Sequence, residues 1–346
     1  MKIENFIEVI HACRYCFMCR HLSGSANVTF READTPRVRA ILLDNVLRQP
    51  ELLAKPDLID TLYAADLSGT CRSNCEKHFD EIGLLLAARQ DLVAAGLAPP
   101  RVAALAEQFR QRPIKPELSG QGDTLYFIDY QSAALPEIPA AFERLMQAAG
   151  IQYRKAENAC PGKVLQVLGY DDEARQRAES FAAAINVAKA KTLVVSNPAA
   201  YYTLSCDFPA WGIELNCQVM HSSEFLAALD LPYRKKAGPL YYLESDFLKN
   251  YCGGYEHPHR LLARLGAEQR DFGNNQEESY SCGEAALVLP QLNPKLARLM
   301  LDYVCARIND PAQDLLVCAA PYTRARLAEV KNLQVLSLEE LAATLL

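Results

Sequence analysis

Three cysteines near the start of the chain have a spacing that suits iron–sulfur chemistry. Cys13, Cys16 and Cys19 are each separated by two residues. Such short spacers turn the backbone tightly, so three thiolates face one [4Fe–4S] cubane and a fourth ligand comes from elsewhere in the chain. Zinc sites more often use pairs of Cys-x2-Cys. The run therefore predicts one [4Fe–4S] cluster, with zinc and no metal as the alternatives.

The fourth thiolate is expected from Cys71 or Cys75. In ferredoxins with two clusters, the fourth cysteine of each run ligates the cluster of the other run. Cys71 and Cys75 have the spacing of a third and a fourth cysteine in a second run. Cys75 is therefore the expected partner of the first cluster, whose complete ligand set becomes Cys13, Cys16, Cys19 and Cys75.

A second cluster would lack most of its ligands. Ser23 stands where the first run would have its fourth cysteine, and Ala65 and Ser68 stand at the first and second positions of the second run. Only Cys71 remains of that set. All three missing cysteines belong to the ligand set of the second cluster and none to that of the first. The sequence therefore predicts that the first cluster is kept and the second is lost.

Apolar and basic residues surround the cysteine run. The apolar side chains would shield a cluster from water, and the arginines would offset its negative charge or dock an acidic partner. Ordinary packing and surface roles are the alternative. These residues are Arg14, Tyr15, Phe17, Met18, Arg20 and His21.

The length, net charge and hydrophobic pattern of the chain limit the class of protein to which it can belong. Its 346 residues suggest two or three packed units. A formal net charge of −6 gives no basic footprint for nucleic acid. No apolar stretch approaches the roughly 20 residues of a membrane span, and the N-terminus does not resemble a signal peptide. We expect a cytoplasmic protein without a transmembrane segment, with any peripheral membrane association made through partners.

The chain has twelve cysteines. In a reducing compartment, clustered cysteines favour metal or redox chemistry over disulfides. Seven of the twelve lie singly beyond residue 75, and most of these are expected to be structural thiols that behave as small buried hydrophobes. They are Cys160, Cys206, Cys217, Cys252, Cys282, Cys305 and Cys318.

The hydrophobic pattern changes along the chain. Residues 1–118 are expected to be helical, with helices over 37–48 and 76–95, and residues 119–122 look like a linker. Strands and helices then alternate, which is typical of parallel α/β sheets. The expected strands are 124–129, 192–196, 240–244 and 315–318, and the expected helices are 172–188, 222–229, 294–308 and 338–345.

The region after the linker contains an internal repeat. LYFID at 125–129 is similar to LYYLE at 240–244, and VMHSSEFLAAL at 219–229 is similar to VLSLEELAATL at 335–345. Two further matches keep the same order. The expected fold is α+β overall: an N-terminal helical ferredoxin-like domain over 1–118, followed by two repeated α/β lobes with parallel sheets over 123–232 and 238–346.

These motifs resemble those of the iron–sulfur subunits of glycolate and D-lactate oxidases and of the related catalytic subunit of heterodisulfide reductases. Such proteins carry a helical ferredoxin-like domain and two copies of a cysteine-rich CCG module. The resemblance covers nearly the whole chain. It rests on Cys13–Cys19, Thr35-Pro36-Arg37, Cys71-x3-Cys75, Cys160-Pro161-Gly162, Pro198, residues 221–226, the Tyr255–Arg260 region, Cys282-Gly283 and Pro321.

Both CCG modules depart from the family pattern. A full module has a lone cysteine, a Cys-Cys-Gly and a Cys-Pro-x-Cys, but the lobes keep only Cys160 and Cys282 of these. One thiolate cannot hold a noncubane cluster, so both modules are interpreted as degenerate and no heterodisulfide-reducing activity is expected. The other module positions fall at or near Tyr130, Ala159 and 197–200 in the first lobe, and at or near Asp246, Ser281 and 320–323 in the second.

The resemblance implies a non-catalytic electron-transfer subunit of an oxidoreductase complex. It would relay single electrons from an FAD-dependent dehydrogenase, acting on a 2-hydroxy acid or similar substrate, to a downstream acceptor. The chain has no nucleotide-binding glycine fingerprint, so the FAD is expected on the partner chain. An interaction scaffold, a redox sensor, and a metalloenzyme with remodelled lobes are the alternatives. His221, His257 and His259 are weak candidates for a small metal site, with Asp246 near the last two.

Overall fold

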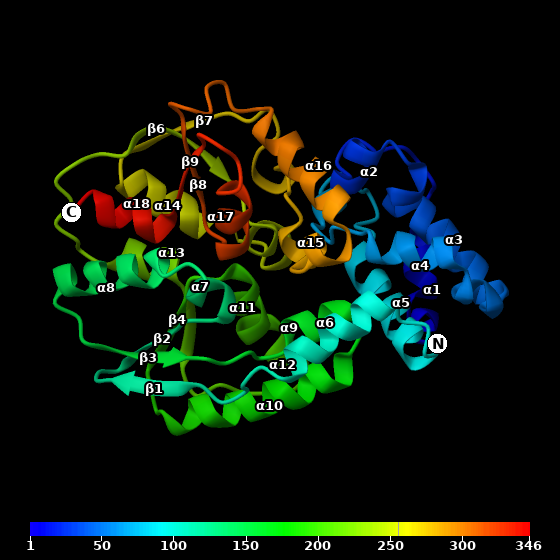
Figure 1. Cartoon of the computed structure of the whole chain (residues 1–346), viewed down its shortest axis with the longest axis horizontal. Helices are drawn as coiled ribbons and strands as arrows, with labels where there is room; N and C mark the ends of the chain where they lie inside the picture. The colour runs from blue at the N-terminus through cyan, green and yellow to red at the C-terminus, as the bar shows by residue number, and fades with distance from the viewer. Residues whose placement is uncertain (255) are drawn as a thin grey trace. The chain divides into compact units, whose positions relative to one another are not determined.

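The computed structural model describes residues 1–254 and 256–346, and it divides into two compact units (Figure 1). The first unit comprises Met1–Gln111, Val164–Ala174 and Glu277–Val304. The second comprises Arg112–Lys163, Arg175–Gln276 and Cys305–Leu346. Tyr255, which belongs to one of the matched family motifs, lies outside the described residues. The predicted boundaries of the two lobes come from the sequence repeat and stay a prediction.

The first unit is helical, and its described residues contain no β-strand. Its longer helices are α3, α4, α5, α6 and α16, and short helices and 3₁₀ turns connect them. The bounds are η1 (Lys2–Phe6), α1 (Ile7–Ala12), α2 (Gly24–Thr29), η2 (Glu32–Asp34), α3 (Pro36–Arg48), η3 (Pro50–Ala54), α4 (Pro56–Tyr63), η4 (Thr70–Arg72), α5 (Glu81–Ala94), α6 (Pro100–Arg110), η8 (Glu284–Ala286), α15 (Leu289–Leu292) and α16 (Pro294–Cys305). Helix α9 (Lys163–Leu168) has all but its first residue in this unit.

Local signals fix where two of these helices begin. Helix α3 starts as predicted, because the Thr35 hydroxyl accepts the Val38 N–H and Pro36 occupies the first turn. The prediction of a helix directly after Cys75 is wrong in its first turn. His78 has a φ of 46°, which an α-helix does not admit. The Asp80 carboxylate then accepts the Gly83 N–H and caps α5, which begins at Glu81.

The second unit contains two sheets. The first has the strand order β1-β3-β2-β4-β5, and all neighbouring pairs are parallel except β1 with β3. Its strands are β1 (Glu117–Gly120), β2 (Thr124–Phe127), β3 (Tyr153–Glu157), β4 (Thr192–Val195) and β5 (Gln218–His221). The predicted linker at 119–122 is wrong in its first half, because Ser119 and Gly120 pair with Lys155 and Arg154 in β1.

The second sheet repeats the topology of the first. Its order is β7-β6-β8-β9 with all pairs parallel, and this matches β3-β2-β4-β5 strand for strand. Its strands are β6 (Gly238–Leu243), β7 (Ala267–Arg270), β8 (Leu315–Cys318) and β9 (Gln334–Ser337). The predicted fold class, α+β with parallel sheets, is confirmed.

Helices cover these sheets and join them through one hydrophobic core. Tyr126, Phe142 and Leu226 from the first repeat and Leu261 and Leu341 from the second belong to a single buried cluster. The remaining helices are α7 (Tyr130–Ala133), α8 (Glu137–Ala149), α10 (Asp171–Val187), α11 (Pro198–Tyr202), the π-helix η5 (Thr203–Asp207), α12 (Phe208–Ala210), α13 (Ser222–Ala228), the π-helix η6 (Phe247–Tyr251), α14 (Glu256–Arg264), η7 (Gln276–Glu278), α17 (Pro321–Leu327) and α18 (Leu338–Thr344).

Strand β2 shows why the central strands could be predicted from the sequence. Leu125 and Phe127 face a core cluster that includes Phe181 of α10, while Tyr126 faces the shared cluster. A strand buried on both faces reads as a continuous apolar run. Among the described residues, no helix is long and apolar enough to cross a bilayer.

Candidate metal centre

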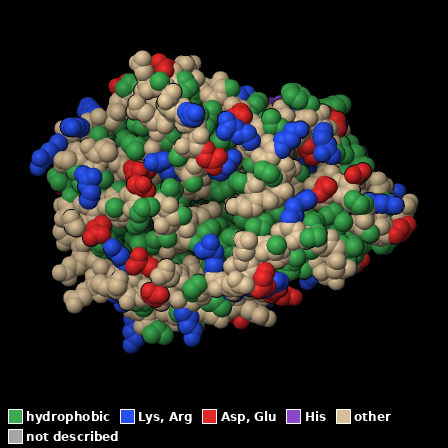
Figure 2. Space-filling view, viewed as in Figure 1, with side chains coloured by type: hydrophobic (Ala, Val, Ile, Leu, Met, Phe, Trp, Pro, Cys, Tyr) green, Lys and Arg blue, Asp and Glu red, His purple; other side chains and the backbone are tan. Residues whose placement is uncertain are grey.

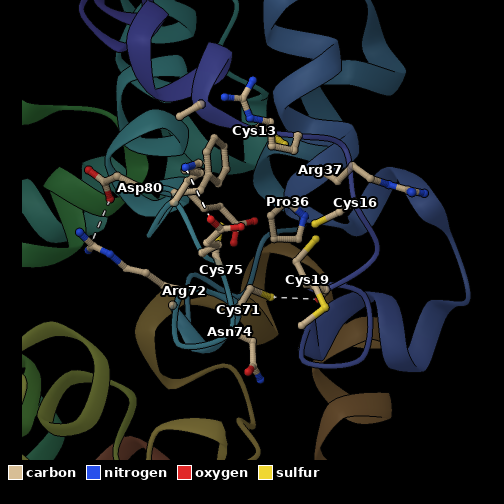
Figure 3. A pocket seen from close by; sticks show the side chains of 18 of the residues that line it. Cys13, Cys16, Cys19, Pro36, Arg37, Cys71, Arg72, Asn74, Cys75 and Asp80 are labelled. Atoms are coloured by element: carbon tan, nitrogen blue, oxygen red, sulfur yellow. Dashed lines mark hydrogen bonds and ion pairs between the residues drawn. The ribbon is translucent and has the colours of Figure 1, made fainter.

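Five cysteines of the first unit line one cavity of about 340 Å³ (Figure 3). Cys13, Cys16 and Cys19 come from the loop after α1, and Cys71 and Cys75 come from η4 and the turn that follows it. The structure therefore brings together all four predicted ligands and the remaining cysteine of the lost set.

The backbone of the first loop turns its thiols inward. Tyr15 has a φ of 54°, a left-handed conformation that bends the chain between Cys13 and Cys16. The Tyr15 N–H donates to the Cys13 sulfur, and the Arg37 N–H donates to the Cys19 sulfur. Hydrogen bonds of this kind stabilise thiolate ligands and tune a cluster's reduction potential. These two contacts favour the thiolate forms, but burial outweighs them and raises the pKa of both cysteines.

Cys71 and Cys75 occupy different parts of the cavity wall. The Cys71 thiol is buried and donates to the Cys19 carbonyl oxygen at 3.4 Å. Cys75 is half-buried; the pKa of Cys13 is raised mainly by burial and, to a smaller extent, by the electrostatic effect of Cys75. Cys75 is thus a close electrostatic neighbour of Cys13, as a shared cluster requires. Its assignment as the fourth ligand stays a prediction, because both cysteines line the cavity.

Burial opposes ionisation of these thiols. It raises the pKa of Cys13, raises that of Cys19 to about 11, and raises that of Cys71 well above its usual range. Thiolates, not thiols, are the ligands of iron and zinc, and metal binding supplies the driving force for losing the proton. A cation in the cavity would therefore be needed for these cysteines to ionise at neutral pH.

The arrangement suits a cluster better than a single ion. Throughout residues 1–254 and 256–346, no three His, Cys, Asp or Glu side chains form a group that could hold one metal ion. A zinc ion needs all its sulfur ligands about 2.3 Å from one point. In a cubane each iron takes its own cysteine, so the four sulfurs spread around the cluster. Thiols that surround a cavity match the second pattern.

Buried polar groups fill the positions expected for a second cluster. Ser23, Ala65, Ser68 and Cys71 are all buried. The Ser23 hydroxyl donates to the Asp34 carbonyl at 2.9 Å. The Ser68 N–H and hydroxyl approach one carboxylate oxygen of Asp66, at 3.2 and 3.3 Å, so both serines at these positions have hydrogen-bonded partners.

An ion pair missed by sequence reasoning completes this network. Arg39, 2% exposed, donates to the Glu81 carboxylate at 2.7 Å and to the Ser25 hydroxyl at 3.2 Å. The Ser25 N–H in turn donates to Asp66 at 3.0 Å. Glu81 also lines the cysteine cavity. The one sequence signal for this ion pair was a charged residue, Arg39, within the apolar stripe of the helix predicted for 37–48.

The side chains around the cysteine run differ in where they lie. Phe17 is 72% exposed and does not line the cavity, whereas Met18, 52% exposed, is among its lining residues, and the expected shielding of a cluster from water stays a prediction. The Arg37 guanidinium lies 4.3 Å from the centre of the Phe17 ring, and Arg20 bonds to Glu32 at 3.1 Å. The loop thus presents an apolar and basic surface beside the cavity.

The positions of the first lobe that were matched to a module lie in a polar cluster at the ends of β2 and β4. Asn197 donates to Asp129 and to Gln131, each at 2.8 Å. Tyr130 is buried, and its pKa is raised by that burial and by the nearby Cys160. The structure therefore brings these predicted module positions together, and the degeneracy of the module stays a prediction.

Three of the remaining candidates have structural partners. His221 is fully buried, its Nδ1 accepts the Ser223 N–H at 3.2 Å, and its Nε2 lies 3.2 Å from the Ser196 carbonyl. His259 pairs with Glu244, and Asp246 lies 3.4 Å from the Lys249 ammonium. Within the described part of the chain none of these belongs to a metal-binding group. Cys282 is buried in the first unit.

Comparison with known proteins supports part of the predicted resemblance. No family model matches the chain. It is 22% identical over 309 residues to one of the subunits of the dihydromethanophenazine:CoB–CoM heterodisulfide reductase of Methanosarcina barkeri, covering 79% of this chain and 74% of that protein. The fold resembles the crystal structure of a hypothetical protein from Helicobacter pylori, with a TM-score of 0.65, 9% identity, and coverage of 99% and 76% of the two chains. This chain is a distant homologue of a heterodisulfide reductase subunit.

Proposed function

We propose that the chain is the electron-transfer subunit of an oxidoreductase complex, with one [4Fe–4S] cluster held by Cys13, Cys16, Cys19 and Cys75. The observation that carries the proposal is the single cavity lined by all of these cysteines. Homology to a subunit of a reductase complex supports a redox role with partner chains. We expect the complex to lie in the cytoplasm.

If this chain holds one such centre, the oxidation of the substrate takes place on a partner chain and this chain only transfers electrons. A bound cubane supplies a one-electron carrier, whereas oxidation of a 2-hydroxy acid releases two electrons. An FAD-dependent dehydrogenase on a partner chain takes the hydride and releases the electrons singly. The buried network around Arg39, Asp66 and Glu81, which occupies the second cluster's predicted place, supports a single relay site.

The exposed loop beside the cysteines is the proposed docking face. Electron transfer needs short distances, and Cys16 is itself exposed. Large apolar side chains at an exposed loop, with an arginine stacked on one of them, are typical anchors of protein–protein interfaces. Phe17, Met18 and Arg37 form such a group. On the face shown in Figure 2, basic and acidic side chains are interspersed, without the extended basic patch that nucleic acid would require.

Cofactor content is the first test. Protein prepared without oxygen should contain about four irons and four sulfides per chain, as expected for one complete cysteine set. About eight irons would mean that discounted ligands hold a second cluster. One zinc without sulfide would refute the cluster.

Electron transfer is the second test. The candidate flavoprotein from the same host should bind the chain and, with its substrate, bleach the visible absorption of the iron–sulfur centre or change its EPR signal. Phe17→Ala should slow this reduction several-fold, whereas Phe30→Ala should not. Phe30 is a matched control, because it is 81% exposed but lies outside the Cys13–Cys19 run that contains Phe17.

The alternative function has its own outcome. If no host flavoprotein binds or reduces the centre, and it stays in one oxidation state across the accessible potentials, the relay proposal fails. The cluster would then serve to hold the first unit together, as in a scaffold.

A further inference from the structure

A second cavity, of about 330 Å³, lies in the first unit, and none of the cysteines assigned to iron lines it. Its wall comes from four parts of the chain: the turn between α2 and η2, the end of α4, the first turn of α6, and the junction of α15 with α16. All four parts belong to the first unit. The cavity has the size of a site for a small organic molecule.

The lining of this cavity is positively charged. Arg31, Arg101 and Lys295 line it, and they come from three different parts of its wall. Asp60 is the one carboxylate among the described residues that line it, so three positive charges against one negative leave a formal charge of +2. The whole chain has a net charge of −6. Basic residues are therefore gathered at this cavity against the charge balance of the chain.

Only one of the three cations has a carboxylate within hydrogen-bond distance. The Arg101 guanidinium lies 2.5 Å from the Asp60 carboxylate. The Nε of Arg31 lies 4.0 Å from the buried carboxylate of Asp34, which is too far for a hydrogen bond. In the part of the chain that the structure describes, the Lys295 ammonium has no carboxylate partner. Two positive charges therefore remain for a ligand.

Two of these cations stand where a helix does not favour them. Arg101 and Lys295 are the second residues of α6 and α16, and neither helix has an acidic residue in its first turn. The N-terminus of a helix carries a partial positive charge, so a cation there lowers the stability of the helix. Residues that break such a local rule are expected at functional sites. An anion in the cavity would offset the cost at both helices.

The apolar part of the wall is held in place. Tyr63 is buried, and its hydroxyl donates to the Leu168 carbonyl at 3.0 Å. Leu292 is also buried and belongs to α15, just before α16. The cavity thus offers fixed apolar surface beside its cations. This combination suits an anion with a small organic part better than an inorganic ion alone.

We propose that this cavity binds a small phosphate monoester. Arg31, Arg101 and Lys295 hold the phosphate group, and Asp60 orients Arg101. A phosphate monoester carries close to two negative charges at neutral pH and three strong acceptor oxygens, which match the charge of the lining and its three cations. Guanidinium groups also fit phosphate through paired hydrogen bonds. A dicarboxylate has the same charge but divides it between two distant ends.

This site is separate from the proposed function, because it uses none of the cysteines and its test needs no electron transfer. The probe is glycerol 3-phosphate, titrated by calorimetry at low salt into the anaerobically prepared full chain, with succinate as the dicarboxylate of equal charge. Glycerol 3-phosphate should bind at least about tenfold more tightly than succinate. Equal affinities, or no binding of glycerol 3-phosphate below about 10 mM, would overturn the proposal.

Charge-neutralising variants test the residues themselves. Lys295→Gln and Arg31→Gln should each weaken the binding of glycerol 3-phosphate at least about tenfold, because each removes a charge-assisted hydrogen bond. Both side chains are exposed, so neither substitution disturbs the core. Arg298→Gln is the matched control. It removes one positive charge from the same helix as Lys295, but Arg298 is 55% exposed, pairs with Asp302 and is not among the lining residues. Unchanged binding in Lys295→Gln, or equal weakening in Arg298→Gln, would contradict the proposed site.

A measurement on the unmutated chain locates the ligand. Glycerol 3-phosphate should slow hydrogen exchange of the amides in the first turns of α6 and α16, because these N–H groups have no carbonyl partner within their own helix. Exchange in α10, which belongs largely to the second unit, should not change. Protection that appears only outside the first turns of α6 and α16 would place the ligand elsewhere and refute the site.

Discussion

The buried pair of Arg39 and Glu81 gives the sharpest test of how the first unit is held together. We consider Arg39→Met, which keeps the length of the side chain but removes its charge. In the native chain Arg39 is 2% exposed and the Glu81 side chain is 14% exposed, with 2.7 Å between Nη1 and Oε1. The substitution leaves the Glu81 carboxylate and the Ser25 hydroxyl without their guanidinium donor.

The magnitude follows from burial. Removing one partner of a buried ion pair costs about 3–5 kcal/mol, because the other charge stays desolvated. At about 1.4 kcal/mol per tenfold change, the equilibrium constant for opening this region should rise by roughly two to three orders of magnitude. Arg39→Met combined with Glu81→Leu should recover most of the loss, because apolar residues of similar size often replace a buried pair without penalty.

Hydrogen exchange is the suitable assay, because a chain with two units need not unfold in one step. Protection of the amides of α3 and α5 should fall in Arg39→Met and return in the double variant. Arg48→Met is the matched control on the same helix. Its ion pair with Asp44 has an arginine that is 71% exposed, so it should change stability by less than about 1 kcal/mol. An equally small effect for Arg39→Met, or a double variant no better than the single one, would refute the reasoning.

Three further predictions concern the cysteines and a buried histidine. Cys75→Ser should lose iron and Cys71→Ser should retain it, and the reverse result in iron analysis would refute the crossover of ligands between runs. Cys160→Ala and Cys282→Ala should leave iron content unchanged, and a loss would mean that a module still binds metal. Burial lowers the pKa of His221 to about 3, so the native state loses stability, on the order of 4 kcal/mol, as pH falls from 6.5 toward 3. His221→Asn should flatten that slope in unfolding free energies measured at pH 7 and pH 4, and an unchanged slope would rule out this role.

Sequence predicted the parts of the fold that are locally encoded. Strand β8 lies at the predicted residues 315–318, because a strand in the middle of a parallel sheet is apolar throughout. Strands β1, β3, β5, β7 and β9 were missed. Of these, β1 and β7 have the residues ELSG and AEQR, which are largely exposed and become strands only by pairing with a neighbour. Their conformation depends on tertiary context rather than on intrinsic preference.

The same distinction applies to the candidate sites. The run from Cys13 to Cys19 was readable because its ligands are neighbours in the sequence. Arg39 and Glu81 are 42 residues apart, and no local pattern joins them. Tyr202 and Tyr251, whose rings lie 5.0 Å apart, are likewise far apart in the sequence, and no local pattern joins them.

The first unit is built from three separate segments of the chain, and this determines when it can be completed during synthesis. The buried guanidinium of Arg89 donates to the carbonyls of Leu62 and Val167, and the Tyr63 hydroxyl donates to the carbonyl of Leu168. Asn74, beside the cysteine cavity, bonds to Glu278 at 2.5 Å. At roughly 5–20 residues per second, a ribosome needs about 10–30 s to pass from residue 112 to the return of the chain at 277. The cysteine loops are made before this interval begins, whereas Val167 and Leu168 are made during it and Glu278 only after it. The supporting contacts of the first unit can therefore be completed only well after its first hundred residues have emerged.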